Sequence, residues 1–124
     1  MTIQLLLKGD QADLMECQDE RGRFPVQTFL ETLTMFQQKQ VLDLFRTFAK
    51  QGAIHNIEKF RNEGKPIFCF KVGQVRIPCF YLPNAAKRTL VVTHGFLKKQ
   101  VKMPRSEWER AFKAYQAVTG TREK

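Results

Sequence analysis

The sequence predicts an α+β fold, in which an N-terminal pair of helices packs on one side of a twisted antiparallel sheet of about four strands and a C-terminal helix follows. Three observations predict it. Apolar residues recur at helical spacing between positions 26 and 49, three apolar runs then follow with short turns between them, and a last amphipathic segment begins at Pro104. A length of 124 residues suits one domain, which we expect to span residues 1–124.

The helix pair is predicted from its start and stop signals. Pro25 suits the first turn of a helix, because its missing N–H costs no hydrogen bond there. Thr34-Met35-Phe36-Gln37 has the form of a capping box, which predicts a second helix over 35–50 with Gly52 as its stop. Because almost no loop separates them, the two helices are expected to form an antiparallel or sharply angled pair.

The sheet is predicted from apolar runs that are rich in β-branched and aromatic residues. They cover residues 67–70, 76–82 and 89–96, with turn-forming residues between them. Pro78 cannot donate a hydrogen bond to a neighbouring strand, so it indicates a bulge or an unpaired site within its own strand.

The two ends of the chain carry shorter patterns. Residues 3–7 and 14–17 are apolar runs around a turn-like cluster, and they form either two strands of a hairpin or one strand with a loose leader. After Pro104, one face of the expected helix is apolar and includes Trp108, Ala111, Phe112 and Tyr115.

The charge of the chain is concentrated in its second half. Residues 1–64 hold 8 Lys and Arg against 9 Asp and Glu, whereas residues 65–124 hold 13 against 3. The net charge of +9 therefore arises entirely from the second half. We expect a localised positive face, for which nucleic acid is the commonest partner and an acidic protein the next.

Cysteine usage and hydropathy indicate the compartment. Cys17, Cys69 and Cys79 lie among apolar neighbours without the spacing of a metal site, so buried, reduced thiols are expected. No apolar run approaches the length of about 20 residues that spans a bilayer, and the start lacks the basic region and cleavage site of a secretory signal. We therefore expect a cytoplasmic protein without membrane contact, metal or cofactor.

Three motifs carry a resemblance to a known family. The first is Gly22-Arg23-Phe24-Pro25-Val26 followed by Phe29-Leu30, and the second is Phe70-Lys71-Val72-Gly73-Gln74-Val75-Arg76 with Tyr81. The third and most specific is His94-Gly95-Phe96-Leu97-Lys98-Lys99 with Lys102 and Pro104. In order and spacing, residues 12–118 resemble toxins of the RelE/ParE superfamily, closest to the HigB and phage-derived branch of type II toxin–antitoxin systems.

The resemblance implies a RelE-like fold and a toxin that is a metal-independent mRNA endoribonuclease. Such an mRNA interferase usually cuts mRNA in the ribosomal A site and so inhibits translation. The resemblance also implies a partner antitoxin, which in the HigA type is a helix-turn-helix DNA-binding protein. RNA cleavage without a metal needs a base for the 2′-hydroxyl proton, an acid for the leaving 5′-oxygen, and cations that stabilise the phosphorane.

Four residues are candidates for this catalysis. Arg76 is assigned to phosphate binding in the transition state, because a guanidinium fork matches two phosphate oxygens. Lys71 and Lys98 are candidates for proton transfer, since crowding by other cations favours the neutral form of a lysine. His94 is a further candidate acid or base, with a hydrogen-bonded core histidine as the alternative.

Four further residues are expected to bind RNA. Lys99, Lys102 and Arg105 are interpreted as contacts to the nucleic-acid backbone. Tyr81 is predicted to stack on a base or to transfer a proton, with packing in the core as the alternative.

Two other functions stay open at this point. The superfamily also contains ParE-type toxins, which inhibit DNA gyrase without catalysing a reaction, and both branches share one scaffold. The other possibility is an inactive, RNA-binding accessory domain of phage origin. Val75 and Pro78 depart from the family pattern and would be its degenerate positions.

Overall fold

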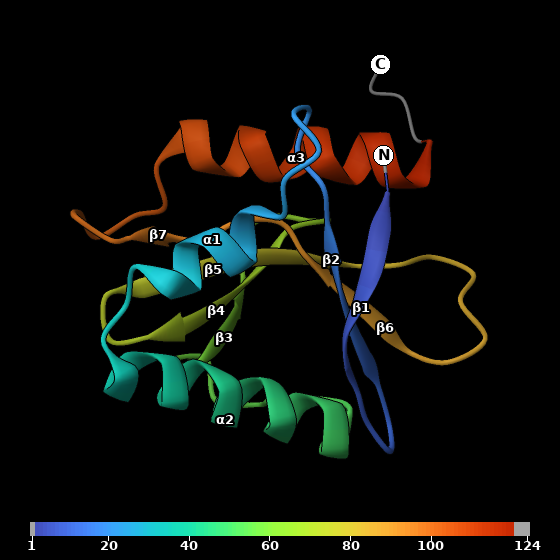
Figure 1. The fold of residues 1–124 in the computed structure, drawn as a ribbon, viewed down its shortest axis with the longest axis horizontal. Helices are drawn as coiled ribbons and strands as arrows, with labels where there is room; N and C mark the ends of the chain where they lie inside the picture. Colours follow the sequence, from blue (N-terminus) through green and yellow to red (C-terminus); the bar gives the residue numbers. More distant parts are fainter. Residues whose placement is uncertain (1, 121–124) are drawn as a thin grey trace.

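The computed structural model describes residues 2–120, which form an α+β fold with three helices and a seven-stranded sheet. Figure 1 shows α2 and α3 on opposite sides of this sheet. The predicted fold class and the three predicted helices are confirmed, whereas the sheet of about four antiparallel strands is wrong in number and direction. The elements in chain order are β1 (Ile3–Lys8), β2 (Asp13–Cys17), α1 (Pro25–Glu31), α2 (Met35–Gln51), β3 (Phe60–Asn62), β4 (Phe68–Val72), β5 (Val75–Tyr81), β6 (Thr89–Val92), β7 (Phe96–Leu97) and α3 (Arg105–Thr119).

The sheet is mixed because one internal pair of strands is parallel. Its order is β1-β2-β6-β5-β4-β3, and β7 pairs with β5 outside this path. Strands β2 and β6 run parallel, with Asp13 opposite Thr89, while the other pairs are antiparallel. A parallel pair joins segments far apart in the chain, so no local turn signals it. Strands β3 and β7 escaped prediction because three and two residues are too few to show a strand period.

The helix pair agrees with its predicted start and stop signals. The Gln37 amide donates to Oγ1 of Thr34 at 3.1 Å, and the Thr34 amide donates to Oε1 of Gln37 at 2.9 Å, which completes the capping box of α2. Gly52 ends α2 in the left-handed conformation, with φ of +81°. Pro25 is the first residue of α1, as predicted.

Both ends of the described chain are also ordered elements. The N-terminal apolar runs form the hairpin β1–β2, which is the first of the two alternatives. Its pairing is irregular between Leu5 and Leu7, where one strand gains a residue. At the other end, α3 begins after Pro104, and the Gly120 amide donates to the carbonyl of Gln116.

Two hydrophobic cores lie on the two faces of the sheet. Helices α1 and α2 cover the first core, where the rings of Phe45 and Phe48 lie 5.0 and 5.9 Å from that of Phe70. Helix α3 covers the second core, where Tyr115 packs edge-on against Phe80 at 5.2 Å. Because side chains alternate along a strand, β5 and β6 are buried on both faces.

The strand after β6 breaks opposite Pro78, where an unpaired site was predicted. The Pro78 carbonyl accepts from the amide of Thr93 at 2.9 Å and from its hydroxyl at 3.2 Å, but Pro78 offers no donor in return. Pairing with β5 resumes only at β7. The break takes residues 93–95 out of the ladder and lets His94 reach α3.

Gly95 marks the point where this break meets α1. A Cβ atom on Gly95 would lie 2.1 Å from Cδ2 of Phe29, so any side chain there would displace the phenylalanine ring. Phe29 is half-buried and packs against the core beneath α1 and α2. The glycine of the His-Gly-Phe motif is therefore required by packing.

The three cysteines are free and buried, as predicted. Burial raises the pKa of Cys17 to about 11 and that of Cys69 to about 12, so both thiols are neutral near pH 7. Within residues 2–120, no helix combines the length and the hydropathy that crossing a membrane requires.

Candidate functional site

The tip of the β4–β5 hairpin places two of the predicted catalytic residues opposite each other. A two-residue turn, Gly73-Gln74, joins the strands, and Gly73 has a φ of +56°. Lys71 and Arg76 are directly paired across the hairpin, so their side chains share one face of the sheet. Nη1 of Arg76 donates to the carbonyls of Gly73 at 2.6 Å and Val75 at 2.8 Å. The turn therefore holds the guanidinium of Arg76, a residue that is only 9% exposed.

Strand β7 brings Lys98 to the same tip. β7 lies on the other edge of β5 from β4, and the Lys98 amide donates to the carbonyl of Gln74 in the turn at 2.7 Å. Three chain segments thus meet here, and they carry Lys71, Arg76 and Lys98. We call these three residues the hairpin cluster.

The hairpin cluster lacks a neutralising partner. Among residues 2–120, no carboxylate lies within 4.0 Å of a charged nitrogen of Lys71, Arg76 or Lys98. Two acids, Asp43 and Glu58, line a cavity of about 410 Å³ beside α2 together with Lys71, but neither forms an ion pair with it. Crowded cations without carboxylates attract an anion.

The predicted RNA-binding residues divide into two groups. Lys99 and Lys102 are exposed on the segment between β7 and α3, and no described carboxylate pairs with either. Arg105 begins α3, where its Nε lies 3.2 Å from Oε2 of Glu109, so its charge has an exposed partner. Of these three residues, Lys99 and Lys102 therefore carry a charge without a described carboxylate partner, and Arg105 does not.

Tyr81 lies away from the hairpin cluster. It follows Arg76 by five residues on β5, which corresponds to about 16 Å along the strand, and alternation puts it on the opposite face. Its ring packs edge-on against Phe68 at 5.1 Å, with the guanidinium of Arg88 5.7 Å from its centroid. Burial raises the pKa of Tyr81. These contacts match the core alternative for Tyr81.

His94 is buried beneath the first turn of α3, with a side chain that is 2% exposed. Nε2 lies 2.9 Å from Oε1 of Glu107, and Nδ1 lies 3.0 Å from the hydroxyl of Thr93. Because a carboxylate only accepts, Nε2 of the neutral imidazole carries the proton and donates to Glu107. Burial, with a smaller contribution from Arg110, lowers the pKa of His94 to about 3. His94 is therefore neutral, as expected of a hydrogen-bonded core histidine.

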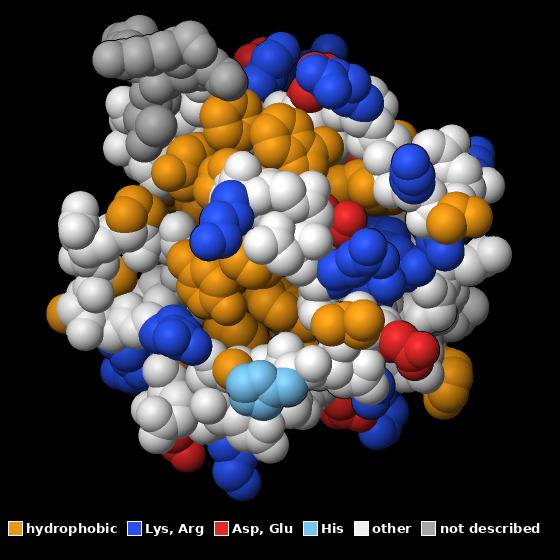
Figure 2. All heavy atoms as spheres, turned by 180° about the vertical axis from the view of Figure 1, so that it is seen from behind, with side chains coloured by type: hydrophobic (Ala, Val, Ile, Leu, Met, Phe, Trp, Pro, Cys, Tyr) orange, Lys and Arg blue, Asp and Glu red, His pale blue; other side chains and the backbone are white. Residues whose placement is uncertain are grey.

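A second basic region was not predicted from the sequence. A cavity of about 350 Å³ lies between the loop after β2, the break at Thr93 and His94, and α3. Its cationic lining residues are Arg21, Arg23, Arg110 and Lys113. In the sequence these residues fall in a short loop and along a helix, and only the fold brings the two segments together. Figure 2 shows that Lys and Arg side chains are spread around hydrophobic patches on one face of the molecule.

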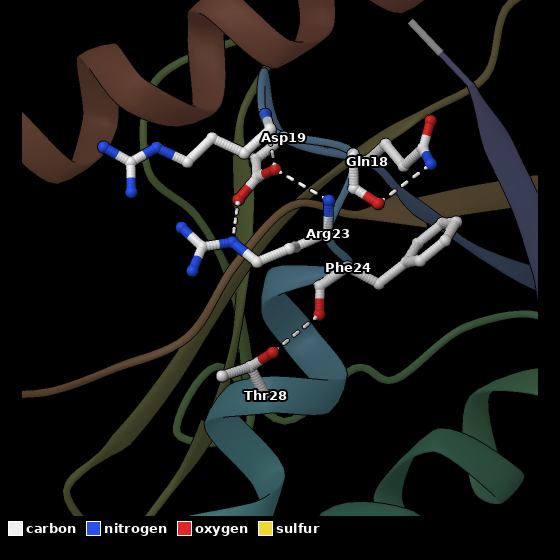
Figure 3. Close-up of polar contacts among 7 residues, drawn as sticks. Gln18, Asp19, Arg23, Phe24 and Thr28 are labelled. Atoms are coloured by element: carbon white, nitrogen blue, oxygen red, sulfur yellow. Dashed lines mark hydrogen bonds and ion pairs between the residues drawn. The ribbon is translucent and has the colours of Figure 1, made fainter.

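The loop that borders this cavity is organised by Asp19 (Figure 3). Oδ1 of Asp19 accepts from the backbone amides of Arg21 and Arg23, each at 2.9 Å, and Oδ2 lies 3.5 Å from Nε of Arg23. The Gln18 side chain closes the loop by donating to the carbonyl of Gly22 at 3.0 Å. The Arg23 amide, with that of Arg21, lowers the pKa of Asp19.

Comparisons with known proteins found no match for this chain. No model of a known protein family matches it, and no curated protein matches it.

Proposed function

We propose that this protein is a toxin of the RelE/ParE superfamily, of the HigB and phage-derived branch, and that it is a metal-independent endoribonuclease. Its substrate would be mRNA on the ribosome, so that its action inhibits translation. The observation that carries the proposal is the hairpin cluster, in which Lys71, Arg76 and Lys98 come from three segments and have no carboxylate partner among residues 2–120. The second and third motifs of the resemblance supply all three residues.

In this proposal Arg76 binds the phosphate that is cleaved. Nη1 is engaged by the carbonyls of Gly73 and Val75, which orients the guanidinium plane. Nε and Nη2 make no hydrogen bond within the described chain, so their N–H groups are available to two phosphate oxygens. A guanidinium anchored in advance stabilises developing negative charge without having to reorient.

Lys71 and Lys98 are the proposed proton-transfer groups because they flank Arg76. In an in-line displacement the attacking 2′-oxygen and the leaving 5′-oxygen lie on opposite sides of the phosphorus. β4 and β7 lie on opposite edges of β5, so one lysine is available on either side of a phosphate held by Arg76. One takes the 2′-hydroxyl proton and the other protonates the 5′-oxygen.

A partner antitoxin belongs to the same proposal. The basic second half of the chain suits acidic segments of such a partner, and a helix-turn-helix protein of the HigA type is the form that the resemblance implies. Covering Lys99 and Lys102 would also deny RNA its approach to the hairpin cluster.

Cleavage of mRNA by purified protein and ribosomes tests the proposal, with primer extension to map the cut sites. We expect the wild-type protein and Lys50→Ala to cut, because Lys50 is exposed on α2 across the sheet. Lys98→Ala and Arg76→Gln are expected to lose cutting while their far-UV spectra stay unchanged. A DNA gyrase supercoiling assay on the same samples covers the ParE-type alternative. Inhibition of gyrase without any mRNA cutting contradicts the ribonuclease proposal.

A further inference from the structure

The cavity between the loop after β2 and α3, here called the loop–helix cavity, has an uncharged floor. Cys17, Thr93 and His94 form this floor. Burial raises the pKa of Cys17 to about 11, and burial lowers the pKa of His94 to about 3, so both are neutral near pH 7. The polar atoms of both other floor residues have protein partners: the Thr93 hydroxyl donates to the Pro78 carbonyl, and His94 bonds to Glu107 and contacts Thr93. Any charge that a ligand meets in the cavity therefore comes from its walls.

The walls are positively charged. Arg21, Arg23, Arg110 and Lys113 stand against two acids, Asp19 and Glu20, which leaves two positive charges. Asp19 is turned into its own loop, where it accepts from two backbone amides and pairs with Arg23. Arg21, Arg110 and Lys113 have no carboxylate within ion-pair distance in the part of the chain that the structure describes. Set against Glu20, these three cations account for the two net positive charges of the lining.

Both walls hold their backbones in place before a ligand arrives. The loop is closed by the Asp19 and Gln18 hydrogen bonds and by Gly22, whose φ of +80° suits a tight turn. Arg110 and Lys113 lie one turn apart on α3, so both are available along one side of the helix. Glu107 ties the start of α3 to His94 in the floor. A preformed wall lowers the ordering cost of binding.

We propose that the loop–helix cavity binds a phosphate group, with Arg21, Arg110 and Lys113 as its cationic ligands. A guanidinium matches phosphate oxygens in two parallel hydrogen bonds, and a volume of about 350 Å³ admits a ligand of mononucleotide size. The phosphate could belong to a free nucleoside monophosphate or to an RNA backbone, since both present the same oxygens. The site shares no residue with the hairpin cluster, so it does not rest on the proposed ribonuclease function.

The test is a titration of ¹⁵N-labelled protein at pH 7 and low ionic strength, followed by amide chemical shifts. The probes are inorganic phosphate, adenosine 5′-monophosphate, and a five-residue oligoribonucleotide without a terminal phosphate. We expect the shifts to gather at residues 18–23 and 110–117. Binding of inorganic phosphate and adenosine 5′-monophosphate identifies a free phosphate ligand, and binding of the oligonucleotide alone identifies a backbone phosphate. No shift at these amides with any probe overturns the proposal.

A pair of double variants decides whether the cavity residues make the site. Arg110→Gln with Lys113→Gln is expected to raise the Kd of the bound probe at least about tenfold. The matched control, Lys39→Gln with Arg46→Gln, removes the same charge from exposed positions on α2 and is expected to leave the Kd within about twofold. If both double variants weaken binding of the probe equally, the probe is attracted by the overall positive charge of the protein and not by this cavity. That result overturns the proposal. Lys98→Ala is expected to leave this binding unchanged, which separates it from the ribonuclease proposal.

Discussion

His94 and Lys98 lie four residues apart in the same motif, yet the fold gives them opposite environments. His94 is buried, neutral and hydrogen-bonded through both ring nitrogens. Lys98 lies beside an exposed turn in a cluster of cations that no described carboxylate neutralises. The strand break opposite Pro78 separates them, because it sends His94 under α3 before β7 resumes pairing. Residues of one motif can therefore serve stability and binding separately.

The largest expected effect comes from the hairpin cluster. Arg76→Gln should lower the rate of mRNA cleavage by about 100-fold or more, because it removes a preorganised donor to the phosphate. It should also cost about 1–2 kcal/mol of unfolding free energy, since the bonds to the Gly73 and Val75 carbonyls are lost. Single-turnover cleavage and urea unfolding measure the two effects. A rate within threefold of wild type would remove Arg76 from the reaction.

His94→Ala should instead act on stability. The change leaves Glu107 and Thr93 without their buried partner and opens a cavity, at a cost of about 2–4 kcal/mol in the free energy of unfolding. Urea unfolding at pH 7.5 measures this cost. Cleavage per folded molecule is expected to fall by less than about tenfold, and a loss as large as that of Arg76→Gln would make His94 a catalytic residue after all.

The pH dependence of stability sharpens the same contrast. The pKa of His94 is about 3 in the folded protein, against an ordinary value near 6.5, so the unfolded chain takes up a proton first as the pH falls. The free energy of unfolding should therefore reach its full value above pH 6.5. Below that pH it should fall by up to about 1.4 kcal/mol per pH unit. The pKa values of Asp13 and Asp19 are lowered in the folded protein. Their contributions to the free energy of unfolding are therefore lost only below the usual pKa range of an aspartate.

Between pH 6.5 and 4.5 the slope should thus report on His94. His94→Gln keeps a donor for Glu107 but cannot be protonated in this range. Urea unfolding at several pH values should show a flatter curve for His94→Gln than for wild type. Parallel curves would show that the acid sensitivity arises elsewhere.

The smallest expected effect is a control on the other face of the sheet. Thr34→Ala removes the capping hydroxyl that accepts from the Gln37 amide and should cost about 1 kcal/mol of unfolding free energy. Cleavage should be unchanged, because Thr34 and Gln37 belong neither to the hairpin cluster nor to the lining of the cavity beside Lys71. If Thr34→Ala also lost cleavage, activity would follow the global stability of the fold. The different effects of changes at His94 and in the hairpin cluster would then not separate stability from catalysis.

Local signals predicted the helices and the strong strands well. The capping box at Thr34, Pro25 at the first turn and Gly52 at the end each act through hydrogen bonds within a few residues. The parallel pairing of β2 with β6 could not be predicted, since it depends on contacts between segments some 76 residues apart. The short strands β3 and β7 exist only because longer neighbours offer them partners.

The candidate site divides in the same way. The cations of the hairpin cluster were identifiable from their motifs, and Lys71 opposite Arg76 follows from a two-residue turn. The loop–helix cavity had no such signal, because Arg21 and Arg110 are neighbours only after α3 has packed on the sheet. Tyr81 shows the limit of residue type alone, since strand alternation points it into the opposite core.

By itself the sequence determined the local elements of this protein: a helix pair whose second helix begins with a capping box, a hairpin with a basic pair at its tip, and a proline that interrupts a strand ladder. These follow from the hydrogen-bonding and rotational limits of neighbouring residues. The tertiary structure alone decided that His94 is neutral and buried, that Lys98 joins Arg76, and that a basic cavity forms beside α3. Burial and long-range charge depend on which segments pack together, and that is a property of the whole fold.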